Sequence, residues 1–126
     1  MDVITFIYIL VGARILIGLA PIVAASFSSR MMGFPIEHDT ATTRLFARLF
    51  GIRDIGLGVL VLFAMPDPRL LGFTLLFNAA TDAADACAIS VPLLRRQGLN
   101  RPAGLSLLLA SSACLAWLTL WWLTHP

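Results

Sequence analysis

The segment at residues 70–94 reads LLGFTLLFNAATDAADACAISVPLL, and it decides the fold. It is almost wholly apolar and exceeds the ~20 residues that an α-helix needs to cross a bilayer. Asp82 and Asp85 nevertheless lie inside it. A charge within hydrocarbon costs about 3 kcal/mol by insertion scales, so such residues are retained where they pair with one another or perform chemistry. The segment therefore predicts a membrane-spanning helix with a polar face.

The composition of the whole chain points to the same class of protein. The 126 residues are 59% hydrophobic and 13% charged, which leaves too little polar surface for a soluble globule. Most of the length falls into four apolar segments, at residues 3–27, 45–65, 70–94 and 102–123. Short connections make consecutive helices antiparallel neighbours. We expect one all-α domain over residues 1–126, an integral membrane four-helix up-down bundle.

The distribution of arginine predicts the orientation of this bundle. The connections at residues 28–44 and 95–101 carry two and three arginines, whereas the connection at residues 66–69 carries one. Because basic loops stay on the cytoplasmic side, both termini should lie outside a bacterial inner (plasma) membrane. No basic residue precedes the first apolar segment, so we expect a permanent span there and not a cleaved signal peptide.

Two other features concern the ends of the spans. Trp117, Trp121 and Trp122 crowd the last turns of the fourth segment, where amphipathic rings are typical of the headgroup level, and we expect them to mark the outer boundary. Pro21 lies inside the first segment. Because neighbouring helices or water can satisfy the carbonyl group that proline frees, Pro21 predicts a kink and not a break.

Helical spacing indicates where the charges of the first two segments point. Arg14, Gly18, Pro21 and Ala25 fall on one stripe of the first helix, whose other members are small. Asp54 falls on a similar stripe of the second helix. The small residues that share this stripe are Ala47, Gly51 and Gly58. Small side chains let two helix backbones approach closely, so Arg14 and Asp54 should face other helices and not lipid.

The third segment carries the densest polar stripe in the chain. Thr74, Asn78, Asp82 and Asp85 share one face, and Thr81 lies beside them. Two carboxylates one turn apart repel each other in a dry site, so either one of them holds a proton or an arginine lies between them. The available cations are Arg14 and Arg53. With Arg48, the spans hold three arginines and three aspartates, which favours a closed internal network.

Two main functional hypotheses follow, and the sequence leaves both open. In the first, the protein is a membrane-embedded acid/base enzyme of the isomerase, cyclase or epoxide-opening type, acting on a lipophilic small molecule in a polar pocket. Its candidate catalytic residues are Asp82, Asp85 and Asp54, and its candidate substrate-binding residues are Arg14, Arg53, Asn78, Thr81 and Thr74. In the second, a non-catalytic membrane subunit or lipid- or quinone-binding protein, the same network only holds the bundle together.

Other partners and sites receive less support from the sequence. A proton-linked carrier is disfavoured because one four-span protomer lacks the repeated, broken halves of transporters, although a homo-oligomer could supply a second half. Asp82 and Asp85 have a D-x-x-D outline but too few oxygen ligands for a metal, and we expect neither a metal nor another cofactor. We expect no nucleic-acid partner. Glu37 and His38 could reach a substrate from the first loop, but a solvated turn is the commoner role for such a run.

Two stretches carry a resemblance to known proteins. MGFP at residues 32–35 and ARLFGIRDIGLG at residues 47–58 resemble a family of small four-span proteins, mostly bacterial and fungal, that is defined as a domain of unknown function. More distantly, the chain resembles DoxX-type four-helix membrane proteins. The most specific element is G-x-R-D-x-G-x-G at residues 51–58, which Arg53 and Asp54 match. The resemblance implies the four-span fold and no particular activity.

Overall fold

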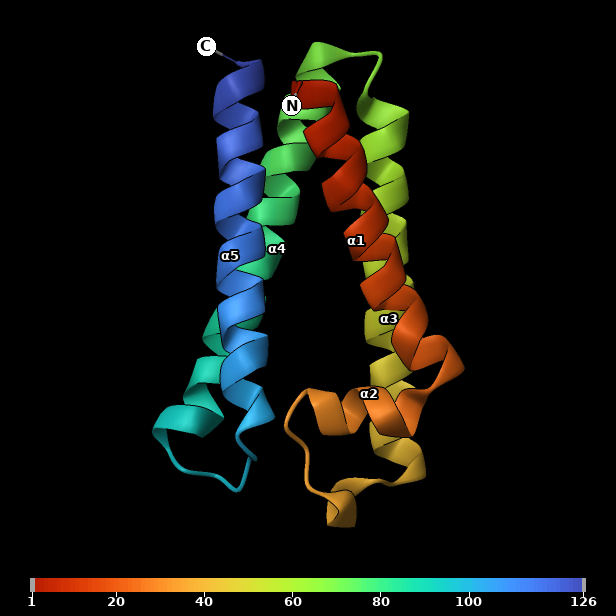
Figure 1. Cartoon of the computed structure of the whole chain (residues 1–126), viewed down its shortest axis with the longest axis vertical. Coiled ribbons are helices and arrows are strands. Elements are labelled where there is room, and N and C mark those ends of the chain that lie inside the picture. The colour runs from red at the N-terminus through yellow and green to blue at the C-terminus, as the bar shows by residue number, and fades with distance from the viewer. Residues whose placement is uncertain (1, 126) are drawn as a thin grey trace.

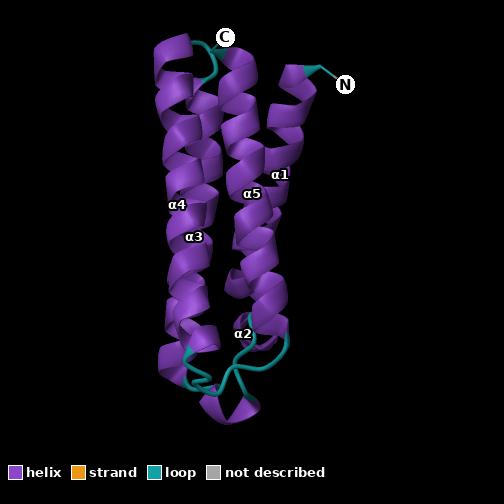
Figure 2. Ribbon diagram, turned by 90° about the vertical axis from the view of Figure 1, so that its left-hand side faces the viewer, coloured by secondary structure: helices purple, strands orange, loops and turns teal. Residues whose placement is uncertain are grey.

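The computed structural model describes residues 2–125 and contains only helices in that part of the chain. The elements in order are α1 (Val3–Val23), α2 (Ala25–Met31), the short 3-10 helix η1 (Ile36–His38), α3 (Ala41–Ala64), α4 (Pro68–Leu94) and α5 (Pro102–Thr124). The four long helices α1, α3, α4 and α5 run alternately up and down the long axis (Figures 1 and 2). The predicted all-α class is therefore confirmed.

The two ends of the molecule differ in structure. One end holds both termini and the tight α3–α4 turn, and the other holds α2, η1 and the loop between α4 and α5 (Figure 1). At this second end, which we call the loop end, the backbone N–H of Asn100 donates to the carbonyl oxygen of Gly33 at 2.7 Å. The two arginine-rich connections are thus joined to each other on the same side of the bundle.

The long helices pack as two pairs. α1 packs mainly on α3, and α4 packs mainly on α5, with fewer contacts between the pairs. The pairs converge at the end with the termini and diverge toward the loop end (Figure 1). The two helix pairs are therefore closest to each other at the end with the termini.

The α1/α3 pair is closest where two glycines meet. A Cβ atom added to Gly18 would lie 2.6 Å from the carbonyl oxygen of Gly51, and one added to Gly51 would collide with the backbone of Gly18. Arg14 lies one turn before Gly18, and Asp54 lies one turn after Gly51. The stripes that spacing predicted for α1 and α3 are buried in the structure, which confirms that both charged residues face other helices.

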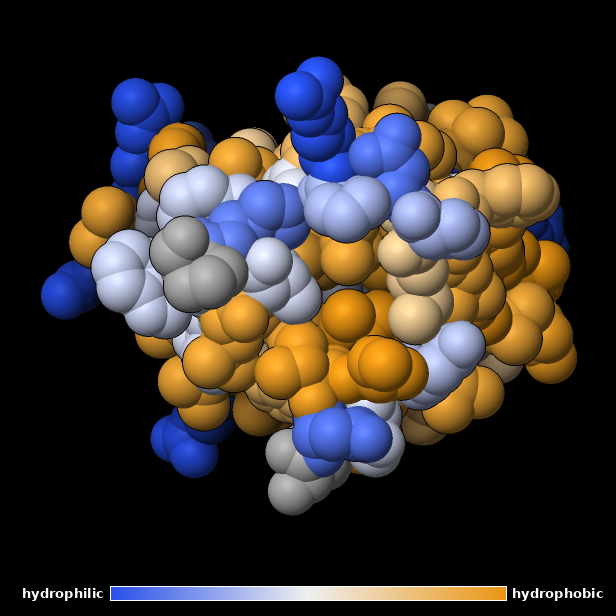
Figure 3. Space-filling view, turned by 90° about the horizontal axis from the view of Figure 1, so that it is seen from above, coloured by the Kyte–Doolittle hydropathy of each residue, from blue (hydrophilic) through white to orange (hydrophobic). Residues whose placement is uncertain are grey.

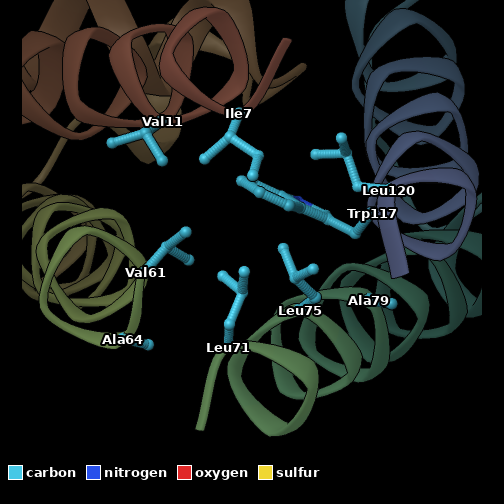
Figure 4. Close-up of a cluster of buried hydrophobic side chains, with 9 residues drawn as sticks. All are labelled: Ile7, Val11, Val61, Ala64, Leu71, Leu75, Ala79, Trp117 and Leu120. Atoms are coloured by element: carbon cyan, nitrogen blue, oxygen red, sulfur yellow. The ribbon is translucent and has the colours of Figure 1, made fainter. Parts of the chain in front are cut away.

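The end with the termini contains a closed apolar core. Figure 4 shows the cluster between the four long helices, consisting of Ile7, Val11, Val61, Ala64, Leu71, Leu75, Ala79, Trp117 and Leu120. Trp117 is only 1% exposed, so the prediction that it belongs to a boundary belt is wrong. Trp122, at 70% exposure, does point outward. Trp117 fills the centre of the bundle because its stripe on α5 faces the other three helices.

The first apolar segment also differs from the prediction. α1 ends at Val23, and Ala24 leaves the helical region with φ −137° and ψ 66° before α2 begins at Ala25. α1 continues through Pro21 without a break, as predicted, but a break that was not predicted follows three residues later at Ala24. The rest of the segment folds as α2 across the loop end, where it buries Ala25, Ser28 and Ser29.

The outer surface of the helices is largely apolar. Large hydrophobic side chains are exposed on all four long helices. Figure 3, seen from above, shows that orange side chains also cover much of the end with the termini. Two helices, Val3–Val23 and Pro102–Thr124, are long and apolar enough to cross a membrane. α3 and α4 carry all but one of the charged side chains of the four long helices, and neither is apolar enough to be counted with these two within the described residues.

Candidate functional site

The centre of the site is a buried ion pair between α1 and α4. Arg14 Nη1 donates to both carboxylate oxygens of Asp82, at 3.0 Å and 2.8 Å. Arg14 is 5% exposed and Asp82 is 6% exposed. Because α1 and α4 belong to different helix pairs, this contact joins the two pairs at mid-height in the bundle.

Asp54 of α3 lies between two guanidinium groups but is held less tightly by each. Its Oδ1 accepts from Arg14 Nη2 and from Arg53 Nη2, both at 3.4 Å. Its Oδ2 accepts no hydrogen bond from any side chain that the structure describes, and it is not among the fully enclosed atoms that lack a partner. One carboxylate oxygen of Asp54 is therefore free to interact with a ligand.

A second, more open ion pair joins α3 to α4. Arg53 donates to Asp85 Oδ1 at 3.0 Å and to Oδ2 at 2.6 Å. The side chain of Arg53 is 39% exposed, and its guanidinium carbon lies 4.5 Å from the centre of the Phe50 ring. The predicted linkage of three helices through Arg14, Arg53 and three aspartates is confirmed.

The balance of three arginines and three aspartates within the predicted spans does not extend to the ion-pair network. Arg48 is exposed, and no ion pair of the described chain includes it. The network consequently contains two guanidinium groups and three carboxylates, and it carries one excess negative charge when all five groups are ionised. Each aspartate has an arginine partner, but one carboxylate remains without a full counter-charge.

A cavity of about 470 Å³ adjoins this network. Its polar wall includes Arg14, Asp54, Asp82 and Asp85, and the rest is mainly apolar side chains from α1, α2, α4 and α5. On α5 the wall extends from Leu105 to Trp117, which spans about 18 Å at 1.5 Å per residue. The cavity is extended along α5 and runs from mid-bundle toward the loop end.

Three enclosed polar atoms without hydrogen-bond partners belong to residues that line this cavity. They are Arg14 Nε, Trp117 Nε1 and Ser28 Oγ. The Arg14 guanidinium carbon lies 5.8 Å from the centre of the Trp117 ring, so two of the three atoms belong to neighbouring side chains. Buried polar atoms without partners cost free energy. A ligand or water that hydrogen-bonds to these atoms would therefore lower the free energy of the site.

Four of the predicted substrate-binding residues lie outside the wall of this cavity, namely Arg53, Asn78, Thr81 and Thr74. Thr74 donates to the carbonyl oxygen of Leu71, and Thr81 donates to that of Phe77, each at 2.9 Å. Asn78 is fully buried, and its Nδ2 donates to the carbonyl oxygen of Thr74. Of the polar stripe of α4, only Asp82 and Asp85 line the cavity. The side chains of Thr74, Asn78 and Thr81 are bonded to carbonyl groups of their own helix.

The remaining candidates lie outside the network. Glu37 and His38 belong to η1 at the loop end, and neither residue is buried. Cys87 and Cys114 are free thiols. Across the described chain, no three metal-ligating side chains of His, Cys, Asp or Glu gather closely enough to hold an ion. A second cavity of about 430 Å³ lies between α2 and α3, with Ser29 and Arg53 in its wall.

Sequence reasoning missed Trp117 and Ser28 as residues of the cavity wall. Ala103, Cys114 and Trp117 fall on one helical stripe of α5, and that spacing could have placed Trp117 inside the bundle. No comparable signal existed for Ser28. Its burial depends on the break at Ala24, which turns α2 beneath the cavity.

Comparison with known proteins identifies a family. The family model described as Domain of unknown function (DUF4267) matches residues 12–123, which include every member of the ion-pair network. Searches of curated proteins and of solved structures found no match.

Proposed function

Since the chain belongs to the DUF4267 family, whose description states no activity, we propose its function from the geometry of the site. The protein is a four-span membrane protein that binds a lipophilic small molecule in the cavity between its helix pairs. It acts on that molecule as an acid/base enzyme. The supporting observation is an uneven set of charges. Three carboxylates and the guanidinium group of Arg14 line a mainly apolar cavity, and Arg53 pairs with two of these carboxylates from outside the wall.

The exposed surface supports the membrane part of this proposal. Phe63 is 77% exposed and Val23 is 84% exposed, and similar side chains surround the bundle. A soluble monomer of this size rarely exposes apolar surface so widely, whereas lipid chains cover it at no cost. The arginines of both basic connections gather at the loop end, so this end faces the cytoplasm and both termini lie outside.

The charge imbalance supports the acid/base part. A buried network with one excess negative charge is stabilised when it takes up a proton, because an uncompensated ion is costly in a medium of low dielectric. Asp82 and Asp85 each receive two short hydrogen bonds from an arginine, whereas Asp54 receives two long ones on a single oxygen. Asp54 is therefore the carboxyl group that carries the proton, with Oδ2 as the atom that delivers it.

Proton transfer from Asp54 suits an isomerisation. The carboxyl group protonates an oxygen of the substrate, which opens a C–O bond or polarises a carbonyl group, and an adjacent carbon then loses a proton to the carboxylate. The proton is returned and no co-reactant is consumed. An acid positioned in this way accelerates such steps by about 10²–10⁴-fold. Arg14 and Arg53 hold the aspartate side chains in place.

The alternative function is a non-catalytic lipid- or quinone-binding protein. It is favoured by one observation, which is that both carboxylate oxygens of Asp82 and of Asp85 accept from an arginine on another helix. Asp82 accepts from one nitrogen of Arg14, and Asp85 accepts from two nitrogens of Arg53, and such charge-assisted contacts fix helix positions. In that case the cavity holds a molecule without changing it.

Hydrogen exchange into a simple ketone tests the proposed chemistry. Purified protein in detergent is incubated in D₂O with a twelve-carbon methyl ketone, and deuterium beside the carbonyl group is measured by mass spectrometry. We expect exchange above the detergent background, and we expect the Asp54→Asn variant to lose it by about 100-fold or more. Asp67→Asn, a change at the exposed N-cap of α4, is the control and should retain it. If the wild type binds the ketone but catalyses no deuterium exchange, the acid/base function is excluded and the non-catalytic binding protein remains.

A further inference from the structure

We infer that the ligand of the long cavity is an uncharged, elongated lipophile that carries an acceptor oxygen at one end, and that Trp117 Nε1–H and Arg14 Nε–H bind this oxygen. The inference rests on the proposed binding of a lipophile in this cavity, and it names the chemistry of the ligand and the residues that select it. It does not depend on whether the ligand is then converted.

The polarity of the ligand follows from the unpartnered atoms. Indole Nε1 and guanidinium Nε can only donate hydrogen bonds. Both atoms are enclosed and without a partner among the described residues, and Trp117 is 1% exposed while Arg14 is 5% exposed. A buried donor that gains an acceptor regains the free energy lost on desolvation. The group beside these two side chains must therefore offer lone pairs, as the oxygen of a ketone, ester or epoxide does.

The charge of the ligand follows from the network. In the described part of the cavity wall, the guanidinium group of Arg14 is the one cationic group, and it is already bonded to Asp82 and Asp54. An anionic end group, such as a carboxylate or phosphate, would meet three aspartates and only one shared cation. A cationic end group could not accept from Trp117 or Arg14. A neutral oxygen satisfies both conditions.

The length of the ligand follows from the positions of the polar atoms. Trp117 lies at the mid-bundle end of the cavity, whereas Ser28 of α2 and Ser106 of α5 line the part nearer the loop end. Ser106 and Trp117 are eleven residues apart on α5, which corresponds to about 16 Å. The wall between them is mainly aliphatic, with Ile17, Leu109 and Ala113 among its residues. An extended hydrocarbon body fits this space, and Ser28 Oγ–H remains for a second polar group at its far end.

The inference is tested with two probes that differ only in the acceptor. The probes are a twelve-carbon methyl ketone and n-dodecane, and binding to purified protein in detergent is measured by isothermal titration and by the shift in melting temperature. The variants are Trp117→Phe, which removes the N–H donor and keeps an aromatic ring, and Trp121→Phe as the matched control one turn further along α5. Circular dichroism confirms that both variants are helical.

We expect the wild type and Trp121→Phe to bind the ketone more tightly than the alkane by about three- to tenfold, the worth of one or two hydrogen bonds. Trp117→Phe should reduce this preference to near unity while alkane binding is retained. Equal affinities of the wild type for both probes, which is the result when water alone occupies the cavity, would overturn the inference. So would a preference that survives in Trp117→Phe. A ketone preference without deuterium exchange would instead remove the acid/base function and leave this inference intact.

Discussion

Arg14 Nη1 of α1 donates to both carboxylate oxygens of Asp82 of α4, at 3.0 Å and 2.8 Å, and joins two helix pairs that diverge toward the loop end (Figure 1). Both partners are at least nine-tenths buried. The pair lies where the closed apolar core gives way to the cavity. It therefore serves two purposes: it sets the separation of the helix pairs, and it supplies charge to the cavity wall.

The burial of this pair predicts a large loss of stability when one partner is neutralised. Asp82→Asn leaves Arg14 with only the long contact to Asp54, so we expect the free energy of unfolding to fall by about 3–5 kcal/mol. Asp85→Asn, at the more exposed pair with Arg53, should cost about 1 kcal/mol or less. Unfolding in detergent, followed by circular dichroism against denaturant, measures both. Equal losses would show that burial does not decide the strength of these pairs.

The glycine contact between α1 and α3 predicts a second effect on stability. Gly51→Ala places a methyl group against the backbone of Gly18, where no flexible side chain can yield, so we expect a loss of about 1–3 kcal/mol. Gly56→Ala, five residues later on the same helix, adds a methyl group in open space and should gain about 0.5–1 kcal/mol. The same unfolding measurement compares the two variants. A neutral Gly51→Ala would contradict the close approach of α1 and α3.

The sequence predicted much of this arrangement because helical periodicity carries most of the information. Arg14 and Asp54 were placed correctly, since each lies on a stripe of small residues that can only face another helix. The position of Trp117 is predicted wrongly because tryptophans near the end of a span are typical of the headgroup level, whereas its helical spacing from Ala103 and Cys114 places Trp117 on the buried stripe of α5. The break at Ala24 depends on a local backbone conformation that no residue type at that position demands.

The composition of the network was harder to predict than its position. Spacing identified which helix face carries Thr74, Asn78 and Asp82, but it could not show which partner each side chain chooses. The side chains of Thr74 and Asn78 donate hydrogen bonds to carbonyl groups of their own helix. These local bonds compete with hydrogen bonds that the same side chains could donate to other helices. Arg48 points outward, which leaves the excess carboxylate on which the proposed chemistry depends.

The shape of the cavity predicts that binding can be blocked without loss of stability. Ala113→Leu directs three more carbon atoms into the cavity from α5, so we expect affinity for the twelve-carbon ketone to fall by at least tenfold. The fold should be as stable as the wild type or more so, because the new side chain fills a void. Ala116→Leu, on the same helix but outside the cavity wall, should retain binding. Titration and thermal unfolding test both parts. Unchanged affinity in Ala113→Leu would place the ligand elsewhere.

The proposed orientation predicts which loops a reagent outside the cell can reach. In a variant whose native cysteines Cys87 and Cys114 are alanine, Pro66→Cys lies in the exposed α3–α4 turn, and Gln97→Cys lies in the exposed loop at the opposite end. A membrane-impermeant maleimide should label Pro66→Cys in intact cells, and it should label Gln97→Cys only after lysis. The reason is that the basic connections stay on the cytoplasmic side. The reverse pattern would place both termini inside, and labelling of both variants in intact cells would contradict a membrane-spanning bundle.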